Sequence, residues 1–520
     1  MVAIGVVLRA GSSLLLLVAS AFRTAVQGLP LEEASKTDVC RRAVEKTEQL
    51  IVGHSLHEAQ QILVEAGPSC PNVPEMFNRL GLAYESEGKY DEARAAFEQA
   101  TRLKPRSASF HNNLAASFIR SGKQASGIAE FEKALEVDAR NSTARLNLAS
   151  VYLGEKQYRR ALSFLDTAEI RQSRDPILLL VLTEAYYGAA QAQPARETAV
   201  RLARLPGVDP KVHFSLGLVL AEHREYQLAA GQFEAIPEDE RDVAAEMNLG
   251  MAYTRLKNFE TARAAYERSI QLDPRNPEPY YHIGIDESAL GNHHAAVGWM
   301  SEAHNQAPDR LDISFALVEE LIHSRNYEQA RTVLTVAIGA RPNDPSLREA
   351  LADLFAAQDQ RNDAVKTYQE CLQLNRGSVS ARLALARVYE EMGQTESARA
   401  ALTEVLKLSP KNAEAEAQLG RLAFEAGHEE EASSLVQRAL AYDPNNLLAN
   451  EYHAKLQLRS GQLSGARQTL ERLVQLDPQS SRFHLLLGRV LARLNRSAEA
   501  EREFELSKDL ELKHGGPERR

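Results

Sequence analysis

The segment Pro74–Ser107 reads PEMFNRLGLAYESEGKYDEARAAFEQATRLKPRS and decides the fold. Its first half has the i, i+3, i+4, i+7 apolar spacing of an amphipathic helix, and Gly88-Lys89 then marks a turn. Its second half has another helical face and ends at Pro105. The segment therefore predicts a pair of antiparallel helices. The residues that form the two faces are Phe77, Leu80, Gly81 and Tyr84, followed by Ala93, Phe97 and Ala100.

This pattern recurs every 34 residues along most of the chain. Small residues such as Gly81 and Ala93 let the two helices of a repeat approach closely. The period and the residue series resemble the tetratricopeptide repeat, and the resemblance covers residues 40 to about 514. It implies an all-α, right-handed superhelical solenoid of antiparallel helix pairs. The second-helix alanine recurs at Ala93, Ala161, Ala195, Ala229, Ala262, Ala296, Ala330, Ala364, Ala398, Ala432, Ala466 and Ala500, with Gly127 in its place once.

The repeats divide the 520-residue chain into unequal parts. The segment 176–242 departs from the regular period, and we expect it to be the least stable part. The charged helix from Ser497 to Lys513 supplies the polar outer face that the end of a solenoid needs. The predicted parts are a signal peptide at 1–21, a tether at 22–39, a degenerate first repeat at 40–73, N-terminal repeats at 74–242, regular repeats at 243–514 and a tail at 515–520.

The first residues predict export. Arg9 precedes a short apolar run, and Ala19-Ser20-Ala21 matches an A-x-A cleavage site. The run is shorter than the roughly 20 residues that span a bilayer. We therefore expect a periplasmic or secreted protein of the exported bacterial type. The alternative is an uncleaved segment that tethers the protein to a membrane through residues 1–22.

Two of the three cysteines fit this oxidising compartment. Cys40 lies at the start of the first repeat and Cys70 near its end. In an antiparallel helix pair these two positions are adjacent, which predicts a disulfide, although two unrelated thiols remain the alternative. Cys371 occupies a small helix-packing position and is expected to be a buried apolar residue.

Composition and motifs favour binding over catalysis. The net charge of −10 argues against nucleic acid as a partner, because that interaction needs a basic surface. Phosphate-loop, nucleophile-elbow, zinc-protease and C-x-x-C motifs are all absent from the sequence, so we expect no enzyme and no cofactor. A His282/Asp286 pair has metal-ligand spacing, but we interpret it, with His293, His294 and His304, as solvated helix and turn residues and predict no metal site.

In the tetratricopeptide-repeat family, the face of the first helix opposite its apolar stripe lines a groove that binds polypeptide. Side-chain amides on that face can pair with a peptide backbone of any sequence, although asparagine is also common there for structural reasons. The candidate amides are Asn78, Asn112, Asn113, Asn147 and Asn248.

Near the C-terminus, the same face is basic in a chain that is acidic overall. Such a stripe attracts an acidic segment, and the alternative is a solvated face whose bases pair with acids of the second helices. The basic residues are Lys455, Arg459, Arg482, Arg489 and Arg493. We expect a non-enzymatic scaffold that binds a protein or peptide partner within an envelope-associated assembly or secretion complex. The alternative is a periplasmic subunit that binds an anionic polysaccharide.

Overall fold

The computed structural model describes residues 38–52, 56–66 and 70–513. The predicted signal peptide, the tether as far as residue 37 and the tail at 515–520 lie outside these residues. Every regular element within the described ranges is a helix, which confirms the all-α prediction. No helix in this part of the chain is both long enough and apolar enough to cross a membrane.

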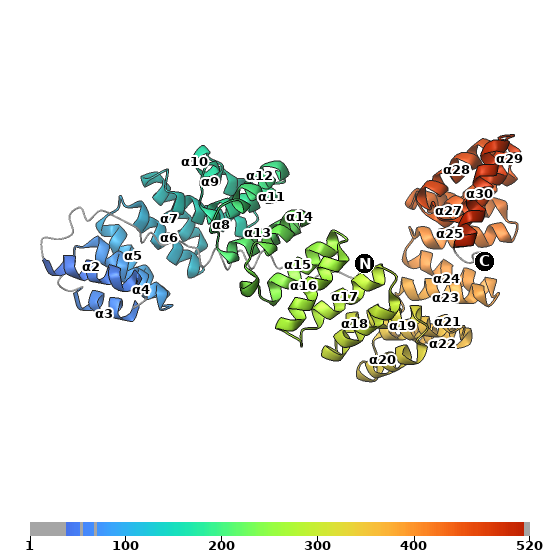
Figure 1. Ribbon diagram of the computed structural model, residues 1–520, viewed down its shortest axis with the longest axis horizontal. Coiled ribbons are helices and arrows are strands. Elements are labelled where there is room, and N and C mark those ends of the chain that lie inside the picture. The colour runs from blue at the N-terminus through green and yellow to red at the C-terminus, as the bar shows by residue number, and fades with distance from the viewer. Residues whose placement is uncertain (1–37, 53–55, 67–69, 514–520) are drawn as a thin grey trace. The chain divides into compact units, whose positions relative to one another are not determined.

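Successive helices form antiparallel pairs along the chain (Figure 1). The helices up to residue 286 are α2 (Asp38–Val52), α3 (Leu56–Ala66), α4 (Pro74–Ser86), α5 (Tyr90–Leu103), α6 (Ala108–Arg120), α7 (Gln124–Val137), α8 (Ser142–Gly154), α9 (Tyr158–Leu165), α10 (Ala168–Arg171), α11 (Pro176–Gly188), α12 (Ala192–Ala203), α13 (Pro210–Glu222), α14 (Tyr226–Glu234), the short 3-10 helix η2 (Glu238–Glu240), α15 (Val243–Arg255), α16 (Phe259–Leu272) and α17 (Pro277–Ala289), which continues past that point.

The remaining helices keep the same alternation of first and second helices. They are α18 (His293–Gln306), α19 (Leu311–His323), α20 (Tyr327–Ala340), α21 (Pro345–Ala357), α22 (Arg361–Leu374), α23 (Val379–Glu391), α24 (Thr395–Leu408), α25 (Ala413–Glu425), α26 (Glu429–Tyr442), α27 (Leu447–Arg459), α28 (Leu463–Leu476), α29 (Ser481–Arg493) and α30 (Ser497–Lys513). The chain divides into two compact parts, an N-terminal half up to Asp286 and a C-terminal half from Glu287.

In several helix pairs, a large side chain of the second helix packs on a glycine of the first. In the repeat at 74–107, the ring of Phe97 lies directly against Gly81, where an added Cβ would be 2.5 Å from Cε1. Gly250 has the same relation to Tyr266, at 2.4 Å. Between α4 and α5, Gly88 adopts a φ of 74°, a conformation that costs glycine little. Close approach and a short turn together explain why these residues form a hairpin of helices.

The irregular segment 176–242 contains a well-packed core, and its expected lower stability stays a prediction for hydrogen exchange. Helix α11 buries a run of five consecutive apolar side chains from Leu178 to Leu182, each at most 3% exposed. They belong to a core that extends from Ala115 to Ala265. The irregular residues lie mostly in the connections, including η2, so the departures from the period change the loops and leave the interior intact.

Replacing Gly250 with Ala should destabilise the N-terminal half by about 1–3 kcal/mol, because the added methyl displaces the fully buried ring of Tyr266. The matched control is Gly231→Ala in α14, where nothing lies within 4 Å of the added Cβ. That exposed helical site should gain up to about 1 kcal/mol. Urea unfolding of both variants tests this prediction, and equal effects in the two variants would contradict the packing argument.

Candidate binding surface

A hollow of about 400 Å³ lies on the first helices of three consecutive repeats, α21, α23 and α25. Leu383 and Ala384 of α23 give it an apolar floor, while Glu349, Arg387 and Gln418 lie around it. This is the face opposite the apolar stripe of the first helix, where the sequence predicts partner binding. Its combination of a partly exposed apolar floor with a charged rim suits a peptide side chain and its backbone.

The predicted asparagines do not line an open surface, which corrects that prediction. All five side chains are at most 6% exposed. Asn113 donates to Asn78 at 2.9 Å, Asn147 donates to Asn112 at 2.9 Å, and Asn112 donates to Asn113 at 3.4 Å. These amides therefore connect α4, α6 and α8 to one another. Asn248 donates to the carbonyl of Ala244 in its own helix at 2.8 Å. An amide in this position satisfies buried polar groups of its neighbours and is not available to a partner.

The five predicted basic residues separate into two groups. Lys455 lies 2.6 Å from Glu451 and 4.1 Å from the centre of the Tyr452 ring, and Arg482 pairs with the same carboxylate. Arg459 lies 3.0 Å from Glu429 at the start of α26. All three bases are paired with acids, but only Arg459 pairs with an acid of a second helix, because Glu451 lies in the first helix α27.

Arg459 also has a packing role, since its guanidinium carbon lies 3.8 Å from the centre of the Phe424 ring. Arg489 and Arg493 differ from the other three. Both are exposed on α29, and neither has an acidic partner within 4 Å among the residues that the structure describes. They are the two bases of the stripe that are available to a ligand.

The N-terminal half carries an acidic pair on the corresponding helices. Burial and the neighbouring charge of Glu222 raise the pKa of Glu184 to about 7. One carboxylate oxygen of Glu184 is buried without a hydrogen-bond partner within the described part of the chain. Glu184 lies in α11 and Glu222 at the end of α13. Burial, the nearby charge of Glu222 and one unsatisfied oxygen all disfavour the ionised form of Glu184, so the charge of this side chain depends on pH near neutrality.

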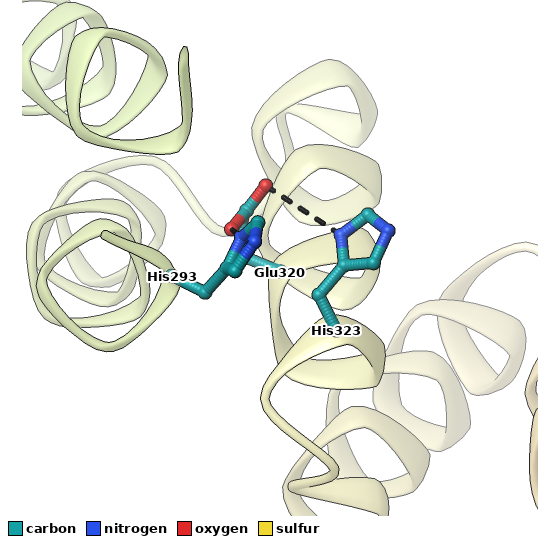
Figure 2. A group of neighbouring side chains, drawn as sticks. All are labelled: His293, Glu320 and His323. Carbon is teal, nitrogen blue, oxygen red and sulfur yellow. Dashed lines mark hydrogen bonds and ion pairs between the residues drawn. The ribbon is translucent and has the colours of Figure 1, made fainter. Parts of the chain in front are cut away.

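The His282/Asp286 pair was expected to be solvated, but Asp286 is only 4% exposed, so that expectation is wrong for this residue. His282 stacks on Tyr266 with ring centres 5.6 Å apart, and Asp286 accepts a hydrogen bond from Thr254 at 2.7 Å. His304 bonds to Ser314 at 3.1 Å, and His294 is exposed. The structure instead brings His293 together with Glu320 and His323 of the next repeat, a group that the sequence analysis did not find (Figure 2). The sequence does contain a signal for this group. An E-x-x-H pair lies in the last turn of a first helix, and a histidine lies at the start of the second helix before it.

Cys40 and Cys70 form a disulfide in the structure, with Cα atoms 5.8 Å apart. The bond joins the start of α2 to the residues that follow α3, which are the two ends that an antiparallel pair brings together. Cys371 is fully buried, as expected, and its burial raises the pKa of the thiol to about 11. It is therefore an inert packing residue.

The fold defines a helical-repeat protein. Comparison with family models then gives the particular family. Tetratricopeptide-repeat models match residues 81–122, 117–176, 243–276, 288–354, 355–406, 391–456 and 453–509. These matches together span more than half of the chain, and the chain is a tetratricopeptide-repeat protein. No functionally curated protein gives a significant sequence match.

Solved structures with a likeness to this chain include yeast Tom70, the Cut9-Hcn1 hetero-tetramer of APC/C and Naa15/Naa10 bound to HypK-THB. Tom70 is 16% identical, with 74% of this chain and 96% of that chain covered and a TM-score of 0.39. Cut9-Hcn1 is 14% identical, with 81% of this chain and 96% of that chain covered and a TM-score of 0.34. Naa15/Naa10 is 16% identical, with 91% of this chain and 76% of that chain covered and a TM-score of 0.31.

Replacing Glu184 with Gln should stabilise the protein at high pH. When folding raises the pKa of a carboxyl group, its contribution to stability is complete at pH values below the unfolded-state pKa. For Glu184 that contribution is lost as the pH rises through about 7. We expect the variant to exceed wild type by about 1–3 kcal/mol at pH 8 and to match it near pH 4. The control is Glu197→Gln, the same charge change at an exposed position of α12. Thermal unfolding between pH 4 and pH 8 measures both, and a difference independent of pH would contradict the assignment.

Proposed function

We propose that this protein is a non-enzymatic scaffold that binds an extended or helical polypeptide along its first helices. The observation that carries the proposal is the hollow on α21, α23 and α25, because its apolar floor at Leu383 and Ala384 suits a peptide side chain. Membership of the tetratricopeptide-repeat family supports the same general role. We further propose that the bound segment is acidic where it reaches α29.

The acidic preference rests on Arg489 and Arg493. Their guanidinium groups are exposed and unpaired within the described residues, so a partner carboxylate does not have to displace an existing ion pair. Arginine also offers two parallel donors to one carboxylate. The same chemistry would hold a polysaccharide with uronic-acid groups, which is the alternative ligand. The apolar floor favours a peptide, because a uronate chain has no aliphatic side chain to place there.

We also propose that the protein is exported and works in an envelope-associated assembly or secretion complex. The A-x-A pattern at Ala19–Ala21 and the Cys40–Cys70 disulfide support this proposal, because disulfides persist in oxidising compartments. The partner itself is defined here only by its chemistry, as a polypeptide with an acidic segment.

Reversing both free arginines tests the acidic preference. The variant Arg489→Glu/Arg493→Glu should bind a labelled peptide of alternating Glu and Leu residues about tenfold or more weakly than wild type at low salt, because attraction becomes repulsion. Wild-type affinity should fall as salt is added. Fluorescence anisotropy measures both effects. Arg459 is left unchanged because it packs on Phe424.

The matched control is Arg502→Glu/Lys508→Glu, which makes the same charge change on exposed positions of α30. Equal weakening by both variants would mean that only net charge matters and would refute a site on α29. The same peptide with Gln in place of Glu should bind wild type more weakly. Binding of oligogalacturonate with no binding of either peptide would favour the polysaccharide alternative instead.

Export predicts a defined mature chain. Protein purified from its native host should begin at or near Phe22 and carry Cys40 and Cys70 as a disulfide. Intact mass before and after reduction and alkylation measures both features. An intact Met1, or two thiols that alkylate without reduction, would contradict the proposal of cleavage and export. In the chain-entropy model, closing this loop with a disulfide stabilises the folded state by roughly 3–4 kcal/mol. The first repeat of the reduced protein should therefore unfold more readily.

A further inference from the structure

We propose that His293, Glu320 and His323 form a binding site for a divalent transition metal of the Zn²⁺ type. The site lies where the start of α18 meets the last turn of α19, so it joins two consecutive repeats (Figure 2). This inference is independent of the peptide-binding surface described above, and the three residues lie together in the C-terminal half.

The three side chains converge on one point. Nδ1 of His293 lies 2.8 Å from Oε2 of Glu320, and Nδ1 of His323 lies 3.9 Å from Oε1 of the same carboxylate. One ligand atom from each residue lies within 4.8 Å of the other two. Donor atoms around a tetrahedral zinc ion are about 3.3 Å apart, given metal–ligand bonds of about 2.0–2.1 Å. Small rotations of the two imidazole rings are enough to reach that geometry, since both rings are partly exposed.

Charge gives a second, independent argument. The side chain of Glu320 is only 5% exposed, and no Lys or Arg pairs with it among the residues that the structure describes. A buried carboxylate needs a compensating positive charge, and here the groups that face it are two histidines and a hydroxyl. Neutral imidazoles leave the carboxylate uncompensated, whereas a divalent cation bound between the three residues neutralises it.

The carboxylate is also held in place from behind. Ser288 of α17 donates a hydrogen bond to Oε1 of Glu320 at 2.6 Å. Hydrogen bonds of this kind orient a metal-binding carboxylate and are typical of the residues that surround a metal site. When a metal binds, the lone pair of each histidine nitrogen turns to the ion and the ring proton resides on the other nitrogen. The hydrogen bond between His293 and Glu320 is thereby replaced by two metal bonds.

The ligand set selects the class of metal. Two imidazoles and one carboxylate suit Zn²⁺, Ni²⁺, Co²⁺ or Cu²⁺, while Ca²⁺ and Mg²⁺ prefer oxygen ligands alone. A tetrahedral ion leaves a fourth position for water or for a side chain of a partner. With three ligands from two repeats, the ion would fix α18 against α19 and stabilise their contact.

The test uses the full-length mature protein and ZnCl2, with isothermal titration calorimetry as the readout. Wild type should bind one Zn²⁺ per chain at this site and should unfold at a higher temperature when Zn²⁺ is present. His323→Ala and Glu320→Gln should each weaken binding more than about 100-fold, and Ser288→Ala about 10-fold. Glu320→Gln preserves the shape of the side chain, so its effect reports the lost charge and ligand.

His294→Ala is the matched control, because His294 is an exposed histidine beside His293 that does not join the group. It should bind Zn²⁺ as wild type does. Cys371 is buried and does not compete for the ion. The proposal is overturned if wild type binds Zn²⁺ no more tightly than the His293→Ala/His323→Ala variant, or if His294→Ala weakens binding as much as His323→Ala does. Thermal stability that does not change with Zn²⁺ would likewise refute the metal site.

Discussion

The close contact between the two helices of each repeat is the constraint on which the rest of the structure depends. A ring such as Phe97 or Tyr266 occupies the space that a Cβ would take at Gly81 or Gly250. The opposite face of the first helix is covered by neighbouring repeats at some positions, such as Asn113, and is partly exposed at others, such as Leu383. Where neighbouring repeats leave this face partly exposed, it is accessible to a ligand, and the hollow on α21, α23 and α25 is such a place.

A second contact recurs between repeats, where the start of a second helix meets the end of the following first helix. Gln124 bonds to Glu155 and Arg459 pairs with Glu429 across 31 and 30 residues of sequence. In both contacts a polar or basic group faces a carboxylate near the protein surface. His293 and Glu320 occupy the same location, but this carboxylate is buried and a second histidine is added. The repeat geometry thus supplies a position at which side-chain chemistry can vary while the backbone stays the same.

The fold was predictable because the same residue pattern recurs in many repeats of the sequence. Glycine or alanine at one position and alanine at another recur in register, and each pair of helices follows from local spacing alone. The side-chain outcomes were less predictable because they depend on neighbours in other repeats. Asn113 was expected at a surface, but its amide is buried and bonds to Asn78 of the preceding repeat and to Asn112. The irregular connections of the segment 176–242 could be read from the sequence, whereas the depth to which α11 is buried depends on its neighbours in the core.

The same dependence on neighbours decides which charges can act on a ligand. Five basic residues share one face by sequence position, yet Lys455 and Arg482 both lie against Glu451 and Arg459 is engaged by Glu429 and Phe424. An incoming carboxylate would have to compete with those contacts, and the gain from exchanging one ion pair for another is small. Arg489 and Arg493 have no such contact to lose. The acids of adjacent helices therefore decide which bases of such a stripe can bind a ligand. In this protein the bases of the stripe that remain unpaired among the described residues are the two on α29.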